Sequence, residues 1–456
     1  MIGVIFYLLV SLYFGKKNPM FYLLIIFAMQ QGSAAFIDQS FAIGGKAVFS
    51  TYDQIFTDVL FLLTTGIAIV FMKARLPAIR FIGSGLISLY LLLIVLLFVL
   101  SLATYYDVAE VFLAGRQLLY VSLSYFLWLA IFSSVTRDQY ESFLRMMFYV
   151  TPVSAILYIL NSSGTYTIFN SDYIYQEIDG SNGTFFRDFG TIPIQLDMIF
   201  VISFLSLTVS TFRIPRWLIV ANMVILPIAM LFTFTRSIIT GILMQIAFIL
   251  LLYALVNSGR IFSQVFKVCL IVTLLLVPVY FGIQKVYPDA FDYFSERITD
   301  ATTEKQNDPN VNIRIAYLEK AIDITDRTSF LLGAGLNKKY YPELDAIGAW
   351  NADSTIPYFL YHTGWLGVFL LYSILIFFIV DGINYFRKTK DWMVAYLVSG
   401  TLTNTISSLL MGGDIFKGSV WTFMNLALYA VIRFNLWRIK ERHQSVEHIS
   451  SSFASA

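Results

Sequence analysis

Runs of about 20 apolar residues recur along the whole chain and constrain its fold more than any other feature. A helix of that length crosses the roughly 30 Å hydrocarbon core of a bilayer. The chain is 58% hydrophobic and only 13% charged, with a mean hydropathy of +0.72, which excludes an ordinary soluble domain. The sequence therefore predicts an all-α, polytopic integral membrane protein. We expect one membrane domain over residues 1–456 with about 12 or 13 spans, near residues 2–15, 20–37, 54–72, 81–103, 112–134, 143–161, 191–209, 216–234, 237–256, 262–283, 354–380, 392–411 and 418–436.

Lysine and arginine predict the orientation of these spans. Alternate connections carry basic residues, from Lys16 and Lys17 through Arg137 and Arg145 to Arg387 and Lys388, and connections of this kind are typically cytoplasmic. The tail 437–456 is then cytoplasmic. Two long loops, 162–190 and 284–353, face the outside of the membrane.

Several partner and cofactor classes are disfavoured by composition. The net charge of +2 and the lack of a long basic block argue against nucleic-acid binding. Cys269 is the only cysteine and lies in an apolar run, so neither a disulfide framework nor a cysteine metal site is expected.

Ionisable residues gather at the outer ends of the predicted spans. Such residues are costly in a membrane and often mark function, although paired or interfacial residues are the alternative. A shared outward-facing polar cavity would explain why they lie on one side. The residues are Asp58, Glu110, Arg116, Asp197, Arg236, Asp353 and His362.

Two short motifs place arginines where they could bind phosphate. The first long loop contains Arg187 and Asp188 between Gly183 and Gly190, and glycines allow a backbone to approach a ligand closely. Arg236 lies on an outer turn at the expected start of a helix, where both the side chain and the helix end favour an anion. Contact with lipid headgroups is the alternative for Arg236.

The second long loop contains an amphipathic run, Val311 to Thr328, with Ile315, Leu318 and Ile322 at helical spacing. Arg314 lies in its first turns, and Gly333-Ala334-Gly335 breaks the pattern after it. An exposed arginine on a surface helix is the commoner fate of such a residue.

Asp353 and His362 follow at the next span. Asp353 stands where this span begins and His362 lies nine residues further, about 13 Å along a helix. A helix-capping carboxylate and a buried structural histidine are the alternative readings.

The order of these parts resembles the O-antigen polymerase and O-antigen ligase superfamily over roughly residues 110–380. The motifs that carry the resemblance are the arginine-containing first loop, the Arg236-Ser237 turn, the late loop with LLGAGL, and the span YFLYHTGWLGVFLLY. The resemblance implies a membrane glycosyltransferase that uses polyprenyl-pyrophosphate-linked oligosaccharides without nucleotide sugar, cofactor or metal. It matches Arg187, Arg236 and Arg314 to arginines that contact the pyrophosphate.

The resemblance also implies an active site on the outer side of a bacterial cytoplasmic membrane. Asp353 is then the first candidate for a general base and His362 the second, with Asp188 and Asp197 behind them and Arg116 in the supporting polar cavity. Protein partners could include a chain-length regulator and a flippase.

One departure bears on the activity. Ligases of this superfamily carry a histidine about ten residues before Thr-Gly, whereas counting back from Thr363-Gly364 reaches Asp353. This departure favours a polymerase of surface polysaccharide over a ligase. Two other classes of protein are alternatives. A lipid transporter or flippase would have internal repeats and charges near the midplane of the membrane. A protein that only binds an assembly partner through its outer loop would not need Arg236 or Arg314 for its function.

Overall fold

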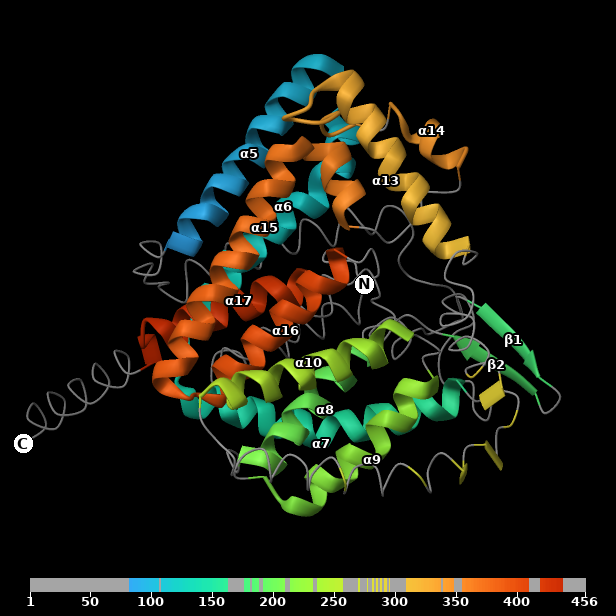
Figure 1. Cartoon of the computed structure of the whole chain (residues 1–456), viewed down its shortest axis with the longest axis vertical. Coiled ribbons are helices and arrows are strands. Elements are labelled where there is room, and N and C mark those ends of the chain that lie inside the picture. The colour runs from blue at the N-terminus through green and yellow to red at the C-terminus, as the bar shows by residue number, and fades with distance from the viewer. Residues whose placement is uncertain are drawn as a thin grey trace, which may run out of the picture. The chain divides into compact units, whose positions relative to one another are not determined.

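The computed structural model confirms the all-α membrane fold (Figure 1). Four helices in the described part of the chain are long and apolar enough to cross a membrane: Ser84–Thr104, Arg137–Leu160, Ile238–Leu255 and Thr355–Thr389. The described residues are 82–105, 108–162, 176–180, 183–187, 192–209, 214–232, 236–256, 309–337, 339–347, 355–409 and 419–437, with single residues between 270 and 295. The three predicted spans before residue 73 lie outside them.

The chain divides into two compact units. The first unit combines Met1–Ala74, Ala130–Ile298 and Asn435–Ala456, and the second combines Arg75–Leu129 with Thr299–Phe434. The first contains α7 (Arg137–Ser162), β1 (Gln176–Gly180), β2 (Gly183–Arg187), α8 (Ile192–Val209), α9 (Arg216–Phe232) and α10 (Arg236–Leu255). The second contains α5 (Ile82–Tyr105), most of α6 (Val108–Ser134), α13 (Pro309–Thr328), α14 (Tyr341–Asp345), α15 (Thr355–Thr389), α16 (Trp392–Leu409) and α17 (Ser419–Arg433).

Two polar side chains in the first unit donate hydrogen bonds to backbone carbonyls inside an apolar core. The Asn222 amide on α9 donates to the Phe148 carbonyl on α7 at 3.1 Å, and the Ser203 hydroxyl on α8 donates to Ile199 one turn back at 2.7 Å. Such internal bonds allow serine and asparagine to sit in helices that otherwise bury leucine and isoleucine. α8 packs against α7, α9 and α10.

At the predicted cytoplasmic end of the second unit, one carboxylate joins α15 to α17. Asp381 accepts hydrogen bonds from the Tyr429 hydroxyl at 2.5 Å and from Arg433 Nε at 3.2 Å. Gly382 beside it has no room for a side chain, because a Cβ there would meet Val398 of α16. The charge is thus paired where three helices approach closely.

A two-stranded antiparallel hairpin in the first long loop was not predicted. β1 pairs with β2 so that Gln176 faces Arg187 and Gly180 faces Gly183. In the sequence, two residues lie between Gly180 and Gly183, and this spacing of turn residues is typical of a hairpin.

α13 confirms the helix predicted for the late loop, but the face that it buries differs from the apolar stripe in the sequence. The buried residues are Tyr317, Ala321, Ile324 and Thr325, whereas Ile315 is 42% exposed. The small Ala321 and Thr325 permit close packing on α15, and Thr325 can bury its hydroxyl because it donates to carbonyls of both helices.

Candidate functional site

Among the described residues of the second unit, the backbone of α15 is broken at Gly364, which has φ 60° and ψ −168°. A positive φ is readily adopted only by glycine among ordinary residues. The break divides α15 into an N-terminal part, 355–363, and a C-terminal part, 365–389. It interrupts the helical hydrogen bonds in the middle of a strongly apolar segment, so the freed backbone groups need other partners.

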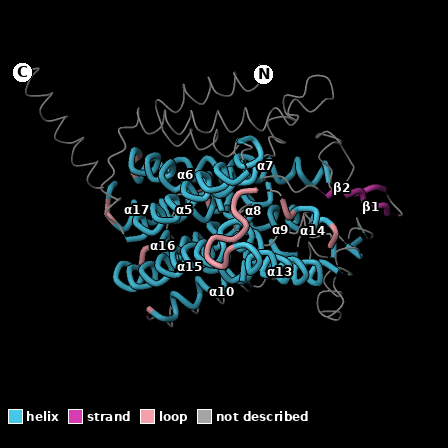
Figure 2. The backbone as a smooth tube through the Cα atoms, turned by 90° about the horizontal axis from the view of Figure 1, so that it is seen from above, coloured by secondary structure: helices cyan, strands magenta, loops and turns pink. Residues whose placement is uncertain are grey.

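The loop that follows α13 supplies those partners. We call residues 329–337 the glycine loop; it is the pink segment after α13 in Figure 2. The Ala334 amide donates to the Tyr361 carbonyl at 2.7 Å, while the carbonyls of Phe330 and Leu331 accept from the amides of Trp365 and Leu366 at 3.1 and 3.2 Å. The loop and the broken helix therefore share a small backbone interface.

Glycines make this interface possible on the loop side as well. Gly333 and Gly335 have φ values of 69° and 82°. A Cβ on Gly333 would meet the backbone of Leu360, Tyr361 and Gly364. The break in the sequence pattern after α13 is thus a site of close backbone approach, rather than a simple linker.

His362 belongs to the same interface. Its side chain is buried, with 1% exposed, and Nδ1 lies 3.0 Å from the Gly335 carbonyl oxygen. A carbonyl only accepts, so Nδ1 carries the proton in this bond and a neutral ring keeps its lone pair on Nε2. The rings of Tyr358 and Tyr361 lie edge-on to the imidazole, with centroids 4.7 and 4.6 Å away. His362, one of the two candidate bases, therefore also joins α15 to the glycine loop through this hydrogen bond.

The backbone of Arg116 lies beside this interface. The preceding Ala114 carbonyl on α6 accepts from the Tyr358 hydroxyl at 3.3 Å, and a Cβ on Gly115 would meet Leu336 of the glycine loop. Leu336 also donates its amide to the Ser101 hydroxyl on α5 at 2.9 Å. The structure thus brings the predicted residues Arg116 and His362 into one neighbourhood, although the Arg116 side chain is not among those described.

Arg314 lies near the N-terminal end of α13, away from the glycine loop that follows the C-terminal end. It is half-buried and stands eleven residues before Thr325, or about 16 Å along the helix axis. The first turn of α13 contains no acidic residue. Arg314 therefore lies near a helix end whose backbone dipole favours an anion.

In the first unit, Arg236 is the first residue of α10, and no acidic residue lies in that first turn either. Asp197 lies on α8, which packs on α10, and both helices begin at the predicted outer side. Its buried Oδ1 has no hydrogen-bond partner among the described residues. Arg187 ends β2.

Some predicted residues lie outside the described part of the chain. Asp188 and Asp353 are not described, and the side chains of Arg187 and Arg236 are not described either. No group of three or more His, Cys, Asp or Glu side chains in the described ranges could hold a metal ion.

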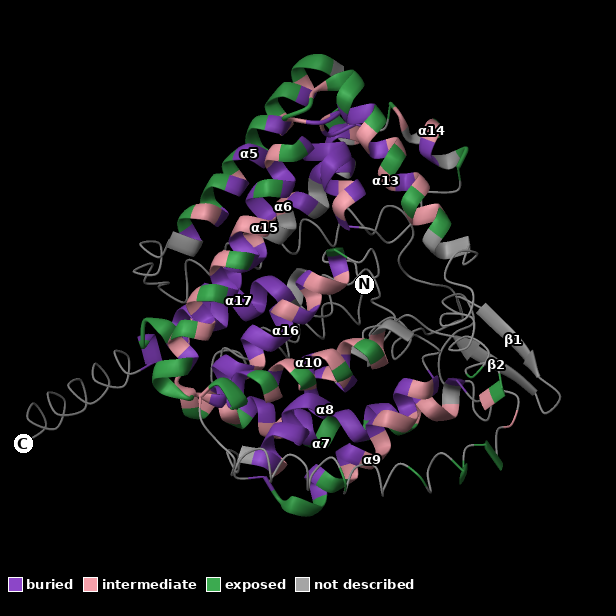
Figure 3. Ribbon diagram, in the orientation of Figure 1, coloured by how far each residue is buried: buried purple, intermediate pink, exposed green. Residues whose placement is uncertain are grey.

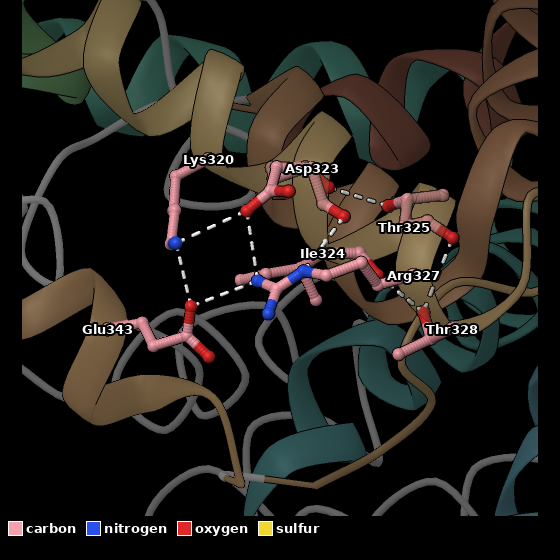
Figure 4. A network of polar contacts seen from close by, with 8 residues as sticks. Lys320, Asp323, Ile324, Thr325, Arg327, Thr328 and Glu343 are labelled. Atoms are coloured by element: carbon pink, nitrogen blue, oxygen red, sulfur yellow. Dashed lines mark hydrogen bonds and ion pairs between the residues drawn. The ribbon is translucent and has the colours of Figure 1, made fainter.

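A ring of four charged side chains fixes α14 to α13 (Figure 4). This ring was not predicted from the sequence. Glu343 contacts Lys320 at 2.7 Å and Arg327 at 2.9 Å, and Asp323 contacts the same two cations at 3.2 and 2.9 Å. The spacing of Lys320, Asp323 and Arg327 along one helix face could have indicated it. The hydrogen bond from Lys320, followed by that from Arg327, lowers the pKa of Glu343.

A family model described as O-antigen ligase matches residues 221–372 of the chain. The match covers 152 of 456 residues, about a third, and includes Arg236, Arg314, Asp353 and His362. It supports a resemblance to the O-antigen ligase and polymerase superfamily and favours neither activity over the other. No curated protein matches the chain.

Gly364→Ala is expected to destabilise the protein. A Cβ at Gly364 would meet backbone atoms of Leu331 and Gly333, and the positive φ alone costs on the order of 1–3 kcal/mol. Gly85→Ala on α5 is the matched control, because a Cβ there meets nothing within 4 Å. We expect the thermal unfolding temperature of detergent-purified protein to fall for Gly364→Ala only. Equal unfolding temperatures would contradict the role given to the break.

Variants of His362 distinguish its hydrogen bond to Gly335 from a role in proton transfer. Asparagine can place an amide N–H near the position of Nδ1, whereas glutamine reaches toward Nε2. We expect His362→Asn to keep most of the stability and activity, and His362→Gln and His362→Ala to lose about 1 kcal/mol of stability each. A His362→Asn protein as stable as wild type but inactive would show instead that the imidazole transfers a proton.

The charge ring predicts a pH-dependent attachment of α14. Because the folded-state pKa of Glu343 is lowered, its contribution is present above the pKa of the unfolded chain and is lost as the pH falls through the folded-state pKa. We expect amide-exchange protection of Tyr341–Asp345 to drop only in that acidic range, and Glu343→Gln to show the drop already at neutral pH. Glu319→Gln, on α13 but outside the ring, should behave as wild type.

Proposed function

We propose that the protein is a membrane glycosyltransferase that polymerises lipid-linked repeat units of a bacterial surface polysaccharide, such as an O-antigen, capsule or exopolysaccharide. One observation carries the proposal. Arg236 and Arg314 lie in the first two turns of helices that have no acidic residue in the first turn, and both belong to the segment that matches the O-antigen ligase family. Arginine and the positive end of a helix both favour a pyrophosphate.

The reaction transfers a glycan between two lipid carriers. A hydroxyl oxygen of one lipid-linked oligosaccharide attacks the anomeric carbon of another, and the bond from that carbon to the pyrophosphate oxygen breaks. The hydroxyl proton passes to a base, and the polyprenyl pyrophosphate departs with the bonding electrons. Negative charge grows on the leaving group, so fixed arginines stabilise the transition state more than the ground state.

Asp353 is the first candidate for the base. It lies two residues before α15 begins at Thr355, in the register where ligases of this superfamily carry a histidine. His362 is the second candidate and would act through Nε2, since Nδ1 faces Gly335. Arg187, Arg116, Asp188 and Asp197 complete the proposed set as phosphate-binding and supporting residues.

The location follows from the same proposal. The active site faces the outer side of a bacterial cytoplasmic membrane, where a flippase would deliver lipid-linked units and a chain-length regulator could act. A ligase that transfers the glycan to a final acceptor is the second candidate, and the family match favours it equally.

A transporter is disfavoured by the way in which α15 is broken. Broken helices in transporters present free backbone groups to a substrate or ion. In α15 the amides of Trp365 and Leu366 and the carbonyl of Tyr361 are paired with the glycine loop. The break therefore allows α15 to pack against the glycine loop, with its backbone groups paired inside the protein.

Arginine replacements test the proposal through glycan length. We expect Arg236→Ala and Arg314→Ala to reduce long lipid-linked glycans roughly 10- to 100-fold, because a hydrogen bond to a charged group contributes about 1.5–3 kcal/mol. Electrophoresis of glycan extracted with the lipid carrier measures the loss. Arg216→Ala is the matched control, since Arg216 also begins a helix without an acidic first turn but at the predicted cytoplasmic side.

Two other results would change the conclusion, provided that the variants are present at the wild-type level. Long chains that remain on the carrier but no longer reach the final acceptor would identify a ligase. Unchanged glycan in both places would remove these arginines from the mechanism.

A further inference from the structure

An exposed apolar corner lies where the glycine loop meets the break in α15. Phe330 and Leu331 are 59% and 58% exposed, although both neighbour the backbone interface, and Trp365 beside them is 36% exposed. The rings of Phe330 and Trp365 lie 6.1 Å apart, centroid to centroid. Large apolar side chains grouped on a surface in this way mark a contact with an apolar environment.

Exposed segments recur between buried ones along α15 (Figure 3). Exposed apolar residues recur along the C-terminal part of that helix: Trp365, Phe369, Ile376 and Val380. In a membrane protein such a stripe faces lipid chains. The stripe begins at the residue whose ring lies against Phe330, so the corner extends it without an interruption.

Helix length gives the depth of the corner. The helix from Trp365 to Arg387 is about 33 Å long, close to the roughly 30 Å of a hydrocarbon core. Arg387 and Lys388 lie in the last turn of α15, as expected for residues at the cytoplasmic headgroups. Trp365 then lies at the outer boundary of the hydrocarbon core, where tryptophan is enriched.

Part of the corner's backbone is already paired. The carbonyls of Phe330 and Leu331 accept from the amides of Trp365 and Leu366, and the Leu332 amide donates to the Ser329 hydroxyl at 3.2 Å. Paired backbone groups can enter an apolar environment at much lower cost than free ones. The second half of α13 also exposes charged side chains to solvent, namely Glu319, Asp323 and Asp326.

We propose that Phe330, Leu331 and Trp365 insert into the outer leaflet of the bilayer and anchor the C-terminal end of α13 at the membrane surface. The occupant of this surface is lipid, because the corner is continuous with the lipid-facing stripe of α15 and lies at the calculated boundary depth. In Figure 1, α13 runs across the direction of α5 within the same unit, which suits a helix lying along a membrane surface. The anchor is independent of the reaction and stands whether or not the arginine variants alter glycan length.

Depth measurements test the anchor. In a Cys269→Ser background, single cysteines replace Phe330 or Leu331 and carry an environment-sensitive fluorophore in vesicles of phosphatidylethanolamine and phosphatidylglycerol. Compared with Asp326→Cys, both positions should be quenched more strongly by lipids spin-labelled near the headgroup and less strongly by aqueous iodide. Asp326→Cys on the exposed face of α13 is the water control, and Ile376→Cys on the α15 stripe is the deep-lipid control.

Two results would overturn the proposal. Strong iodide quenching at positions 330 and 331, equal to that at 326, would place the corner in water. Protection from both quenchers would show that protein covers it.

Discussion

The backbone interface between the glycine loop and the broken helix α15 is the constraint on which the second unit depends. An apolar helix cannot expose free amides and carbonyls within a membrane, so Gly364 is tolerated only because Phe330, Leu331 and Ala334 supply partners. Three glycines with positive φ bring the two backbones together. Because this pairing involves α13 and α15, and Leu336 adds a bond to α5, the loop fixes the helices to one another.

This arrangement fixes one end of the helix that carries Arg314. The C-terminal end of α13 is held by the loop, by the bond from Thr325 to Leu360 and by the apolar corner, while Arg314 lies toward the opposite end. An arginine on a fixed helix can stabilise growing charge without reorganising during the reaction. In the first unit, Arg236 is the first residue of α10.

Hydropathy was sufficient to predict the membrane class, the four described helices that are long and apolar enough to cross a membrane, and the existence of α13, since these depend on local composition and period. The buried face of α13 could not be predicted, because Ala321 and Thr325 are chosen by close packing on α15 rather than by hydrophobicity. The partner of His362 was also hidden, because Gly335 is 27 residues distant and meets it only through the fold. The placement of arginines at helix ends was predicted for Arg236 and Arg314, whereas their ligand stays a prediction.

The most direct test of the central claim is the affinity of purified protein for a polyprenyl pyrophosphate, measured for wild type, Arg314→Ala and Arg216→Ala in the same lipid nanodiscs. The account predicts that Arg314→Ala weakens binding roughly 10- to 100-fold, as the loss of a charge-assisted contact requires, and that Arg216→Ala binds like wild type. Equal affinities for all three proteins would contradict the account, since the end of α13 would then have no part in holding the pyrophosphate.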